Sequence, residues 1–220
     1  MPNFFKSIVG SFKNPEQTWL SFVVEMVILI SIVLFIRFYV FQFFQVSGPS
    51  MCPTLNELNA ECKNGKGEFV FVNQATYKFI RPPAVGEVVV FRPPSDTKDY
   101  YIKRVMGVPG DVIKVYDGKV YKVNDEGQDV EIEEPYLSAR NQGRTQTDQE
   151  IFTVPEGKYV LFGDNRDRSL DSRRCYGATC SSLGATPYVP AESIKGKAEF
   201  VIWPFWTMRW MENPFEAPAS

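Results

Sequence analysis

One serine in this sequence, Ser50, lies in a turn that would present a side chain rather than pack it. The turn, residues 46–55, reads VSGPSMCPTL and begins where a long apolar run stops. Gly48 permits backbone angles that other residues avoid, while Pro49 and Pro53 fix φ and remove two N–H donors. The same residue types dominate ordinary turns, so a simple linker between two parts of the chain is the alternative interpretation.

The sequence contains no histidine, and this restricts the chemistry that Ser50 could perform. Ser-His-Asp and Cys-His nucleophile systems need an imidazole, and so do histidine-ligated metal sites. If Ser50 is a nucleophile, its base must be a lysine, a carboxylate or the amino terminus. The formal net charge of −2 gives no sign of nucleic-acid binding, which normally shows a basic patch. We therefore expect no nucleic-acid partner.

A lysine among apolar neighbours is the first candidate for that base. Residues 100–111 read YYIKRVMGVPGD and place Lys103 and Arg104 on an expected strand. An unperturbed lysine has a pKa of about 10.4, and burial lowers that pKa because it disfavours the charged form. Since side chains alternate along a strand, we expect one of the two basic residues to point inward. The alternative is that both extend to solvent at a strand end.

A third segment could support such a pair. Residues 161–173 read LFGDNRDRSLDSR, an apolar strand that enters a turn rich in acids and arginines. Alternating acids and arginines can form a hydrogen-bonded network that fixes a loop beside a site. Ser169 and Ser172 add hydroxyls that could orient an amine. An ordinary solvated turn with salt bridges is the alternative. Together the three segments indicate a serine-lysine dyad of Ser50 and Lys103.

A long apolar run precedes the Ser50 turn. Residues 19–44 are dominated by Phe, Val, Ile and Leu, and their only charges are Glu25 and Arg37. A bilayer core of about 30 Å needs about 20 apolar residues in a helix, so the run predicts one transmembrane anchor helix. A buried core helix is the alternative. A cleaved signal peptide fits less well, because the run exceeds the usual apolar region and no A-x-A-like site follows it.

Charges on either side of the run predict its orientation. Lys6 and Lys13 precede the run, whereas Glu57 and Glu61 come before the first lysine that follows it. By the positive-inside rule, residues 1–18 form a cytoplasmic segment and the large domain lies outside. Residues 200–215 hold all but one of the four tryptophans, and they either pack on the core or contact the lipid bilayer interface.

Short β-like runs separated by turn signals follow the Ser50 turn. Asp117-Gly118 between two alternating runs is a strong hairpin signal. The expected strands are residues 68–73, 87–91, 111–116, 119–123, 158–162 and 197–203. These features predict a mainly β domain of twisted, antiparallel, barrel-like sheets over residues 45–215. We expect residues 124–150 to be an exposed insertion and residues 216–220 to be a disordered tail.

The four cysteines, Cys52, Cys62, Cys175 and Cys180, lack the paired C-x2-C spacing of a structural zinc site. Cys175 and Cys180 enclose a short loop, so a local disulfide between them is one expectation if the domain faces an oxidising compartment. Free buried thiols are the alternative. Four cysteines allow three full pairings, and the sequence does not choose among them.

Three blocks of the chain resemble, in the same order, the motifs of bacterial type I signal peptidases. These are membrane-anchored serine-lysine proteases that remove signal peptides from exported proteins. The blocks are Ser50-Met-Cys-Pro-Thr-Leu55, residues 101–111 and residues 163–173. A weaker fourth match begins at Gly196-Lys-Ala198 and resembles the family's closing strand. The resemblance runs from the apolar run to about Phe205.

The resemblance implies a role for each matching residue. Ser50 would be the nucleophile, Lys103 the general base, and Ser169 the hydroxyl that holds the lysine amine. The backbone N–H of Ser50 would stabilise the oxyanion. The supporting residues would be Asp164, Arg166, Asp171 and Arg173. The residues lining shallow pockets for small side chains at substrate positions −1 and −3 would be Phe44, Val46, Met51, Leu55 and Ile102.

The resemblance also implies a location and a substrate class. We expect a single-pass protein of the bacterial cytoplasmic membrane, with its catalytic domain on the outer face, signal peptides as substrates, and no metal or organic cofactor. Gly48 departs from members that carry a serine there as a second oxyanion donor. Two alternatives remain: a dedicated serine-lysine processing protease, such as one of a conjugation system, and a membrane-anchored β domain that binds peptides without cleaving them.

Overall fold

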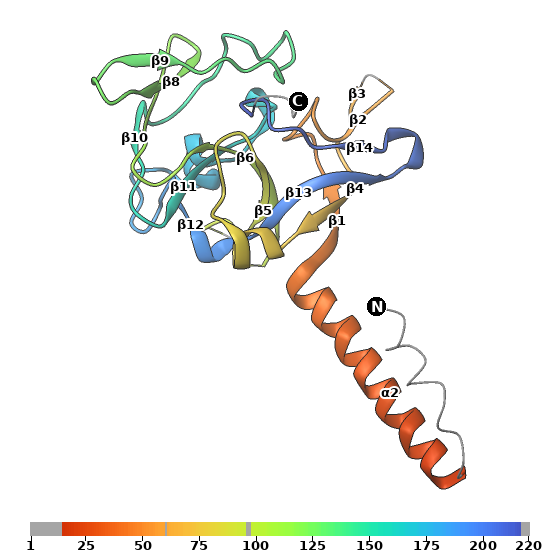
Figure 1. Cartoon of the computed structure of the whole chain (residues 1–220). Coiled ribbons are helices and arrows are strands. Elements are labelled where there is room, and N and C mark those ends of the chain that lie inside the picture. The colour runs from red at the N-terminus through yellow and green to blue at the C-terminus, as the bar shows by residue number, and fades with distance from the viewer. Residues whose placement is uncertain (1–14, 60, 96–97, 217–220) are drawn as a thin grey trace. The chain divides into compact units, whose positions relative to one another are not determined.

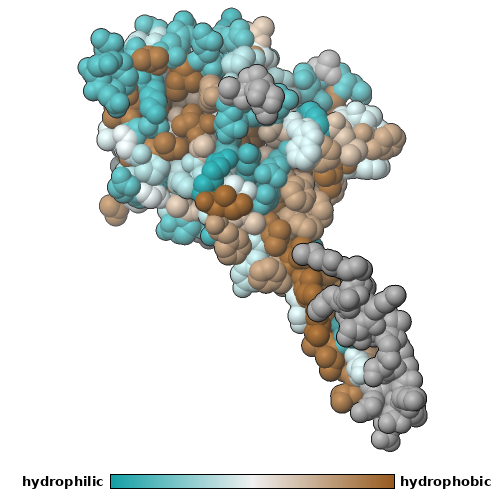
Figure 2. All heavy atoms as spheres, viewed as in Figure 1, coloured by the Kyte–Doolittle hydropathy of each residue, from teal (hydrophilic) through white to brown (hydrophobic). Residues whose placement is uncertain are grey.

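A computed structural model describes residues 15–59, 61–95 and 98–216 (Figure 1). The chain divides into two units, residues 1–40 and residues 41–220. The first contains α2 (Pro15–Phe35), which continues as a π-helical segment, η1 (Ile36–Val40). Within it, Trp19–Val40 is long and apolar enough to cross a membrane, and none of its most apolar stretch is buried in the protein. Where the helix can be seen in Figure 2, most of its surface is hydrophobic.

The helix differs at both ends from the expected anchor of residues 19–44. It begins at Pro15, because proline suits the first helical turn, where its missing N–H costs no hydrogen bond. It ends at Val40, and residues 41–44 belong to strand β1 (Phe41–Ser47) instead. The reason is that residues from Phe41 onward pair with a neighbouring strand, which fixes them as extended chain. Residues 1–14 of the expected cytoplasmic segment (residues 1–18) and residues 217–220 of the expected tail (residues 216–220) lie outside the described residues.

The second unit is built on an eight-stranded antiparallel sheet. Its strands run in the order β1-β4-β13-β5-β6-β11-β12, and β14 pairs with β13. Besides β1, their bounds are β4 (Lys66–Asn73), β5 (Val88–Phe91), β6 (Tyr101–Gly107), β11 (Lys158–Phe162), β12 (Val189–Pro190), β13 (Ile194–Trp203) and β14 (Arg209–Trp210). Register shifts in β1, β11 and β13 are β-bulges or irregularities, which strengthen the local twist and curl the sheet. A mainly β domain of twisted antiparallel sheets is thus confirmed.

A smaller four-stranded sheet has the order β10-β7-β8-β9 (Figure 1). Its strands are β7 (Val112–Tyr116), β8 (Lys119–Val123), β9 (Asp129–Glu131) and β10 (Ile151–Thr153). β7 and β8 form the expected hairpin, and both turn residues, Asp117 and Gly118, have positive φ, as a type I′ turn requires. A third pair joins β2 (Glu57–Leu58) to β3 (Glu61–Cys62). The remaining short helices are η2 (Thr76–Ile80), η3 (Arg166–Arg168), η4 (Ser172–Gly177), η5 (Ala191–Ser193) and η6 (Phe205–Thr207).

Residues 124–150 are only partly the exposed insertion that we expected. They contain strand β9, and three of their side chains, Leu137, Asn141 and Thr145, are buried. Glu134 in the same stretch pairs with the buried Arg166. The polar composition suggested exposure. Instead, Thr145 and Asn141 accept hydrogen bonds from Arg166 and Asp167 of the 161–173 segment, which we call the support loop.

Two disulfides join the four cysteines, so none is free. Cys175 pairs with Cys180, which is the local bridge considered from the sequence. Cys52 pairs with Cys62 and so links the Ser50 turn to β3. A bridge that closes a short loop restricts the unfolded chain and stabilises the folded one. The Ser50 turn is therefore held covalently as well as by packing.

Candidate active site

The turn that carries Ser50 is rigid because its backbone is hydrogen-bonded on both sides. Gly48 adopts a φ of 85°, a conformation that favours glycine, and its N–H donates to the carbonyl of Gly65 at 3.1 Å. The Leu55 N–H donates to the Met51 carbonyl at 2.9 Å. Met51 and Leu55 pack into the core formed with β4, β5 and β13. Their packing anchors the turn from below and leaves Ser50 only partly buried.

A buried asparagine that the sequence reading missed ties this turn to β4. The Asn56 amide donates to the carbonyls of Val46 at 3.3 Å and Gly48 at 3.0 Å. Its backbone N–H donates to Glu68 Oε2 at 2.7 Å, and its side-chain oxygen accepts the Glu68 N–H at 2.9 Å. Arg209 pairs with Glu68 and donates to the Thr54 carbonyl. Asn56 has a φ of 61°, a region that asparagine enters more readily than most residues. This preference of asparagine for positive φ was the signal in the sequence that could have marked Asn56 as a turn residue.

Lys103 lies directly against the nucleophile candidate. Strand β6, which carries it, is central in the large sheet, and the side chain is only 3% exposed. Its Nζ lies 2.7 Å from Ser50 Oγ and 2.9 Å from the carbonyl oxygen of Ile102. Burial lowers the pKa of Lys103 to about 8, although the carboxylates of Asp171 and Asp164 oppose that shift. A lysine with this pKa is partly neutral near pH 8 and can accept a proton from a hydroxyl.

Two of the four expected supporting residues, Asp171 and Arg173, form a fully buried ion pair beside the dyad. Arg173 donates to both carboxylate oxygens of Asp171, at 3.0 and 2.8 Å. Burial raises the pKa of Asp171, but the Arg173 guanidinium outweighs it, so the pKa stays below its ordinary value. Asp171 also accepts the N–H of Gly163 at 2.8 Å. The Asn165 N–H then donates to the Ser50 carbonyl at 3.0 Å, which joins this loop to the nucleophile turn.

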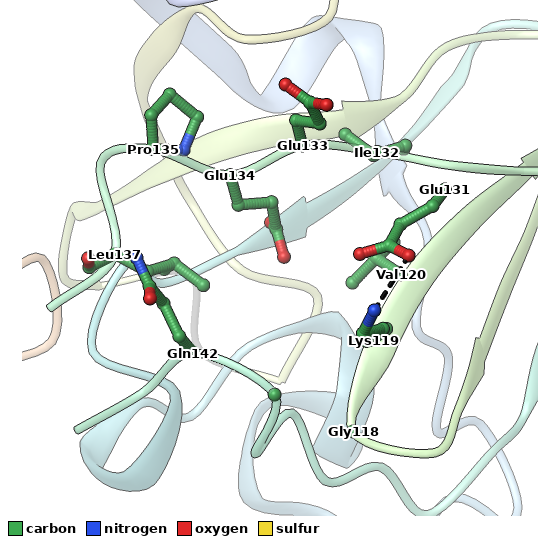
Figure 3. A pocket seen from close by; sticks show the side chains of 11 residues that line it. Gly118, Lys119, Val120, Glu131, Ile132, Glu133, Glu134, Pro135, Leu137 and Gln142 are labelled. Atoms are coloured by element: carbon green, nitrogen blue, oxygen red, sulfur yellow. Dashed lines mark hydrogen bonds and ion pairs between the residues drawn. The ribbon is translucent and has the colours of Figure 1, made fainter. Parts of the chain in front are cut away.

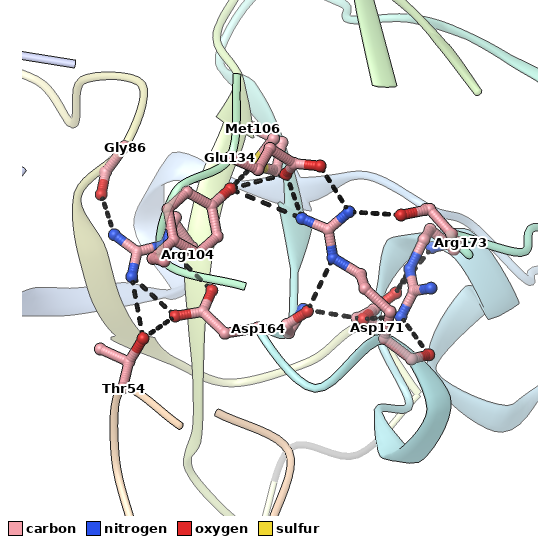
Figure 4. Close-up of polar contacts among 12 residues, drawn as sticks. Thr54, Gly86, Arg104, Met106, Glu134, Asp164, Asp171 and Arg173 are labelled. Atoms are coloured by element: carbon pink, nitrogen blue, oxygen red, sulfur yellow. Dashed lines mark hydrogen bonds and ion pairs between the residues drawn. The ribbon is translucent and has the colours of Figure 1, made fainter. Parts of the chain in front are cut away.

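The other two, Asp164 and Arg166, extend the network to Arg104 and Glu134 (Figure 4). Arg104 binds both oxygens of Asp164, at 2.9 and 2.6 Å, and Asp164 accepts a hydrogen bond from Thr54. Arg166 donates to the carbonyl of Gly163 and pairs with Glu134. The expectation that only one of Lys103 and Arg104 points inward was wrong. Strand β6 is covered on both faces, and both side chains are buried.

Ser169 lies at the dyad without making its expected contact. Its hydroxyl is buried close to the Asp171 carboxylate, and among the described residues it makes no hydrogen bond of regular geometry. A side chain added at Gly163 would overlap both this hydroxyl and the carbonyl of Ser50, so the three groups are in close contact. The Lys103 amine is held instead by the carbonyl of Ile102. The hydroxyl nevertheless lies where it could donate or accept once a substrate or water enters.

A cleft of about 650 Å³ opens at Ser50 and Lys103. Three of the five expected pocket residues, Phe44, Val46 and Ile102, line it. Met51 and Leu55 do not, because both are fully buried core residues beneath the turn. The lining residues that the sequence reading missed are Gln45, Ser47, Lys66, Val70, Val90, Asp99, Tyr100, Tyr101, Arg168 and Leu170. The two valines stand in runs that are apolar at every position, residues 69–72 and 88–91, so alternation could not mark them, and the other residues carried no local signal either.

A second cavity, of about 360 Å³, lies by the smaller sheet between β8, β9 and the 132–143 stretch (Figure 3). It is lined by Glu131, Glu133 and Glu134, and Lys119 pairs with Glu131 across one side. It contains no residue able to act as a nucleophile beside a base. Across residues 15–59, 61–95 and 98–216, no group of three histidine, cysteine or acidic side chains could hold a metal ion.

A serine hydroxyl bonded to a buried lysine, in a chain without histidine, is the arrangement of a serine-lysine hydrolase. The fold places this pair on a twisted antiparallel sheet that follows an apolar helix. The class that fold and site define together is therefore a serine-lysine hydrolase with a candidate membrane anchor.

Comparison with known proteins identifies the family. The model of the family "Signal peptidase, peptidase S26" matches residues 19–203. Signal peptidase I of Rickettsia massiliae is 32% identical over 91% of this chain and 84% of its own length. Signal peptidase I T of Bacillus subtilis is 32% identical over 90% of this chain and 92% of its own length. A solved signal peptidase I from Enterococcus faecalis is 27% identical and covers 53% of this chain and 97% of that chain, with a TM-score of 0.38.

The chain belongs to the signal peptidase family, peptidase S26. It is accordingly a serine endopeptidase of the signal peptidase I type. The resemblance drawn from three sequence blocks is confirmed over most of the chain.

Proposed function

We propose that this protein removes signal peptides from preproteins with Ser50 as nucleophile and Lys103 as general base. The observation that carries the proposal is the 2.7 Å contact between Lys103 Nζ and Ser50 Oγ at the cleft. Burial lowers the lysine pKa to about 8, which makes the neutral amine accessible at mildly alkaline pH. A neutral amine at this distance can take the hydroxyl proton as the oxygen attacks.

The reaction then proceeds in two halves. Ser50 Oγ attacks the scissile carbonyl while its proton passes to Lys103 Nζ, and the backbone N–H of Ser50 donates to the oxyanion that forms. The lysine returns that proton to the leaving amine, the peptide C–N bond breaks, and the signal peptide remains as an ester on Ser50. A water molecule then attacks the ester while one of its protons passes to the same lysine. The lysine returns that proton to Ser50 Oγ as the ester C–O bond breaks, which releases the signal peptide with a free carboxyl group and restores the dyad. Gly48 offers no hydroxyl for the oxyanion.

The substrate enters as an extended strand beside β1. Among the described strands of the large sheet, β1 pairs with β4 alone, so its other edge can accept a peptide by β-augmentation. Phe44, Val46 and Ile102 line the cleft along that edge. Small apolar pockets discriminate by excluding bulk, which suits small residues at positions −1 and −3 relative to the scissile bond. Met51 and Leu55 would support the pocket floor from the core rather than touch the substrate.

The protein is anchored in the bacterial cytoplasmic membrane by the Trp19–Val40 span, with the β domain on the outer face. The two disulfides of the β domain support that orientation, because disulfides persist in oxidising compartments outside the cytoplasm. Exposed aromatic side chains near the C-terminal end, Trp203, Trp206 and Trp210, suit the lipid interface, where tryptophan is favoured.

The test is cleavage of a preprotein with an A-x-A site by the full chain in nonionic detergent. We expect cleavage after that site, and loss of cleavage in Ser50→Ala and Lys103→Ala variants whose circular dichroism matches that of the wild type. Activity retained in either folded variant would rule out the dyad. Cleavage of only one particular preprotein would favour a dedicated processing protease, and binding without turnover would favour a peptide-binding domain.

A further inference from the structure

Two contacts mark the two ends of the cleft, where β1 and the Ser50 turn face strand β6. At one end Ser50 Oγ lies 2.7 Å from Lys103 Nζ. At the other end the ring of Phe44 meets the ring of Tyr100 edge to face, with centroids 5.1 Å apart. Tyr100 precedes Lys103 by three residues, which is about 10 Å of extended chain. The two rings therefore close the end of the cleft that is remote from the nucleophile.

The spacing of the lining residues assigns this remote end to substrate position −3. Phe44 and Val46 both line the cleft and are two residues apart on β1, with Val46 nearer to Ser50. Positions −3 and −1 are also two residues apart, so in an extended substrate their side chains lie on the same face. Because the scissile bond lies at Ser50, position −1 faces Val46. Position −3 then faces the rings of Phe44 and Tyr100.

Tyr100 also lines another cavity, of about 480 Å³, which we call the side cavity. Among residues 15–59, 61–95 and 98–216, it is the only one that lines both the cleft and the side cavity. Pro93, Pro94 and Ile194 form the apolar part of the side cavity's lining. A cavity of roughly 150 Å³ is enough to hold benzene, so the side cavity has the volume for an aromatic side chain. The Tyr100 ring is therefore a wall that the two spaces share.

A cation holds the Tyr100 ring in this position. The guanidinium carbon of Arg92 lies 4.7 Å from the centroid of the ring, and a cation over an aromatic face is attracted to it. The strand register explains the contact, because β5 and β6 pair Phe91 with Tyr101, which places Arg92 opposite Tyr100. The ring thus contacts Phe44 from β1 and Arg92 from the end of β5.

We propose that Tyr100, held by Phe44 and Arg92, is the specificity-determining residue that limits the size of the substrate side chain at position −3. The proposal rests on the proposed function, since it places a signal peptide in the cleft. Without the ring, the cleft and the side cavity would join, and a bulky side chain at −3 could extend into the side cavity. One methylene group changes the selectivity of an apolar pocket by about 10- to 200-fold, so loss of a whole ring should change it at least about tenfold.

The experiment uses the full chain in nonionic detergent and preprotein reporters that share one signal peptide. The first reporter has Ala at −1 and −3, the second has Phe at −3, and the third has Leu at −1. The quantity measured is the −3 ratio, which is kcat/KM for the Phe reporter divided by kcat/KM for the Ala reporter. We expect a −3 ratio of about one tenth or less in wild type.

Three variants test the ring and the cation that holds it. Tyr100→Ala should raise the −3 ratio at least about tenfold, whereas Tyr100→Phe keeps a ring and should leave the ratio as in wild type. Arg92→Ala should raise the ratio about two- to fivefold, which is the expected contribution of a cation over an exposed ring. Tyr116→Ala is the matched control and should not change the ratio, because Tyr116 is 38% exposed, Tyr100 is 36% exposed, and Tyr116 lies outside the cleft on β7.

A change of ratio separates selectivity from damage, because a misfolded variant would lose cleavage of all reporters together. Equal cleavage of the Ala and Phe reporters by wild type, or an unchanged −3 ratio in Tyr100→Ala, would overturn the proposal while leaving the proposed function intact. An equal gain for the −1 Leu reporter in Tyr100→Ala would also overturn it, since the cleft would then be loosened as a whole. An unchanged ratio in Arg92→Ala would overturn the role of Arg92. Failure of wild type to cleave the Ala reporter would instead overturn the proposed function.

Discussion

Lys103→Met should abolish cleavage and at the same time stabilise the protein. In the folded chain the lysine is buried and its pKa is about 8, whereas its unperturbed value is 10.5. Each unit of pKa difference corresponds to about 1.4 kcal/mol, so the buried lysine costs up to about 3 kcal/mol at neutral pH. Methionine has a similar shape and no charge to desolvate. The variant should therefore unfold at a higher urea concentration than wild type at pH 7.

The sign of the pH dependence follows from proton binding. Between pH 8 and 10.5 the unfolded chain keeps a proton on Lys103 that the folded chain has released. Stability rises with pH wherever the unfolded state binds more protons. The cost of the lysine is thus constant below about pH 8 and is relieved as the pH approaches 10.5. The advantage of Lys103→Met should shrink over the same window and vanish near its upper end.

Urea titration in nonionic detergent, followed by tryptophan fluorescence at pH 7, 9 and 10.5, measures this difference. Lys63→Met is a matched control, because Lys63 is exposed and its replacement should change stability by no more than about 0.5 kcal/mol at every pH. Equal stability of wild type and Lys103→Met at pH 7, or an advantage that grows with pH, would refute the reasoning. Either result would mean that the folded protein does not depress the lysine pKa.

Three further outcomes follow from the same geometry. The kcat/KM of wild type should rise about tenfold per pH unit below pH 7 and level off above a midpoint near 8, and a midpoint near 10 would contradict a depressed base pKa. Gly163→Ala should lower kcat/KM roughly a hundredfold, because its methyl group would displace Ser169 and the nucleophile carbonyl; Gly65→Ala, with open space around it, should leave kcat/KM unchanged. Replacing both Cys52 and Cys62 by serine should cost roughly 2–3 kcal/mol in urea titration, and reductant should destabilise wild type more than this variant, which keeps only the Cys175–Cys180 bridge.

The sequence brought Ser50 and Lys103 forward as the candidate pair because its composition left few options, and the structure places their side chains 2.7 Å apart. Without histidine, Ser50 needed another base, and Lys103 was the lysine set among apolar neighbours. Local patterns also predicted the β7–β8 hairpin, since Asp117-Gly118 favours one turn type. These signals are local in the chain, which is why they could be read without a structure. The hydroxyl of Ser169, by contrast, was assigned by resemblance, and its hydrogen bond to the lysine stays a prediction.

Features that depend on long-range contact could not be predicted in the same way. The Asn56–Glu68–Arg209 cluster joins residues from three distant segments, and no local pattern marks them as partners. Met51 and Leu55 were assigned to the substrate pocket because they flank the nucleophile, but the turn directs them into the core. The end of the helix at Val40 was missed because apolar residues continue into β1, and only pairing with β4 distinguishes strand from helix there.

Lys103 and Arg104 are neighbours on one strand, yet their pKa values shift in opposite directions. Both are buried on β6, and alternation sends their side chains to opposite faces. Arg104 meets Asp164 in a two-oxygen pair, which outweighs burial and holds the pKa of Arg104 above its ordinary value. Lys103 meets a hydroxyl and a carbonyl instead, so burial dominates and the pKa falls to about 8. Arg104 thus keeps its charge and fixes the support loop through Asp164. Lys103 can lose its proton, and for that reason it can act as a base.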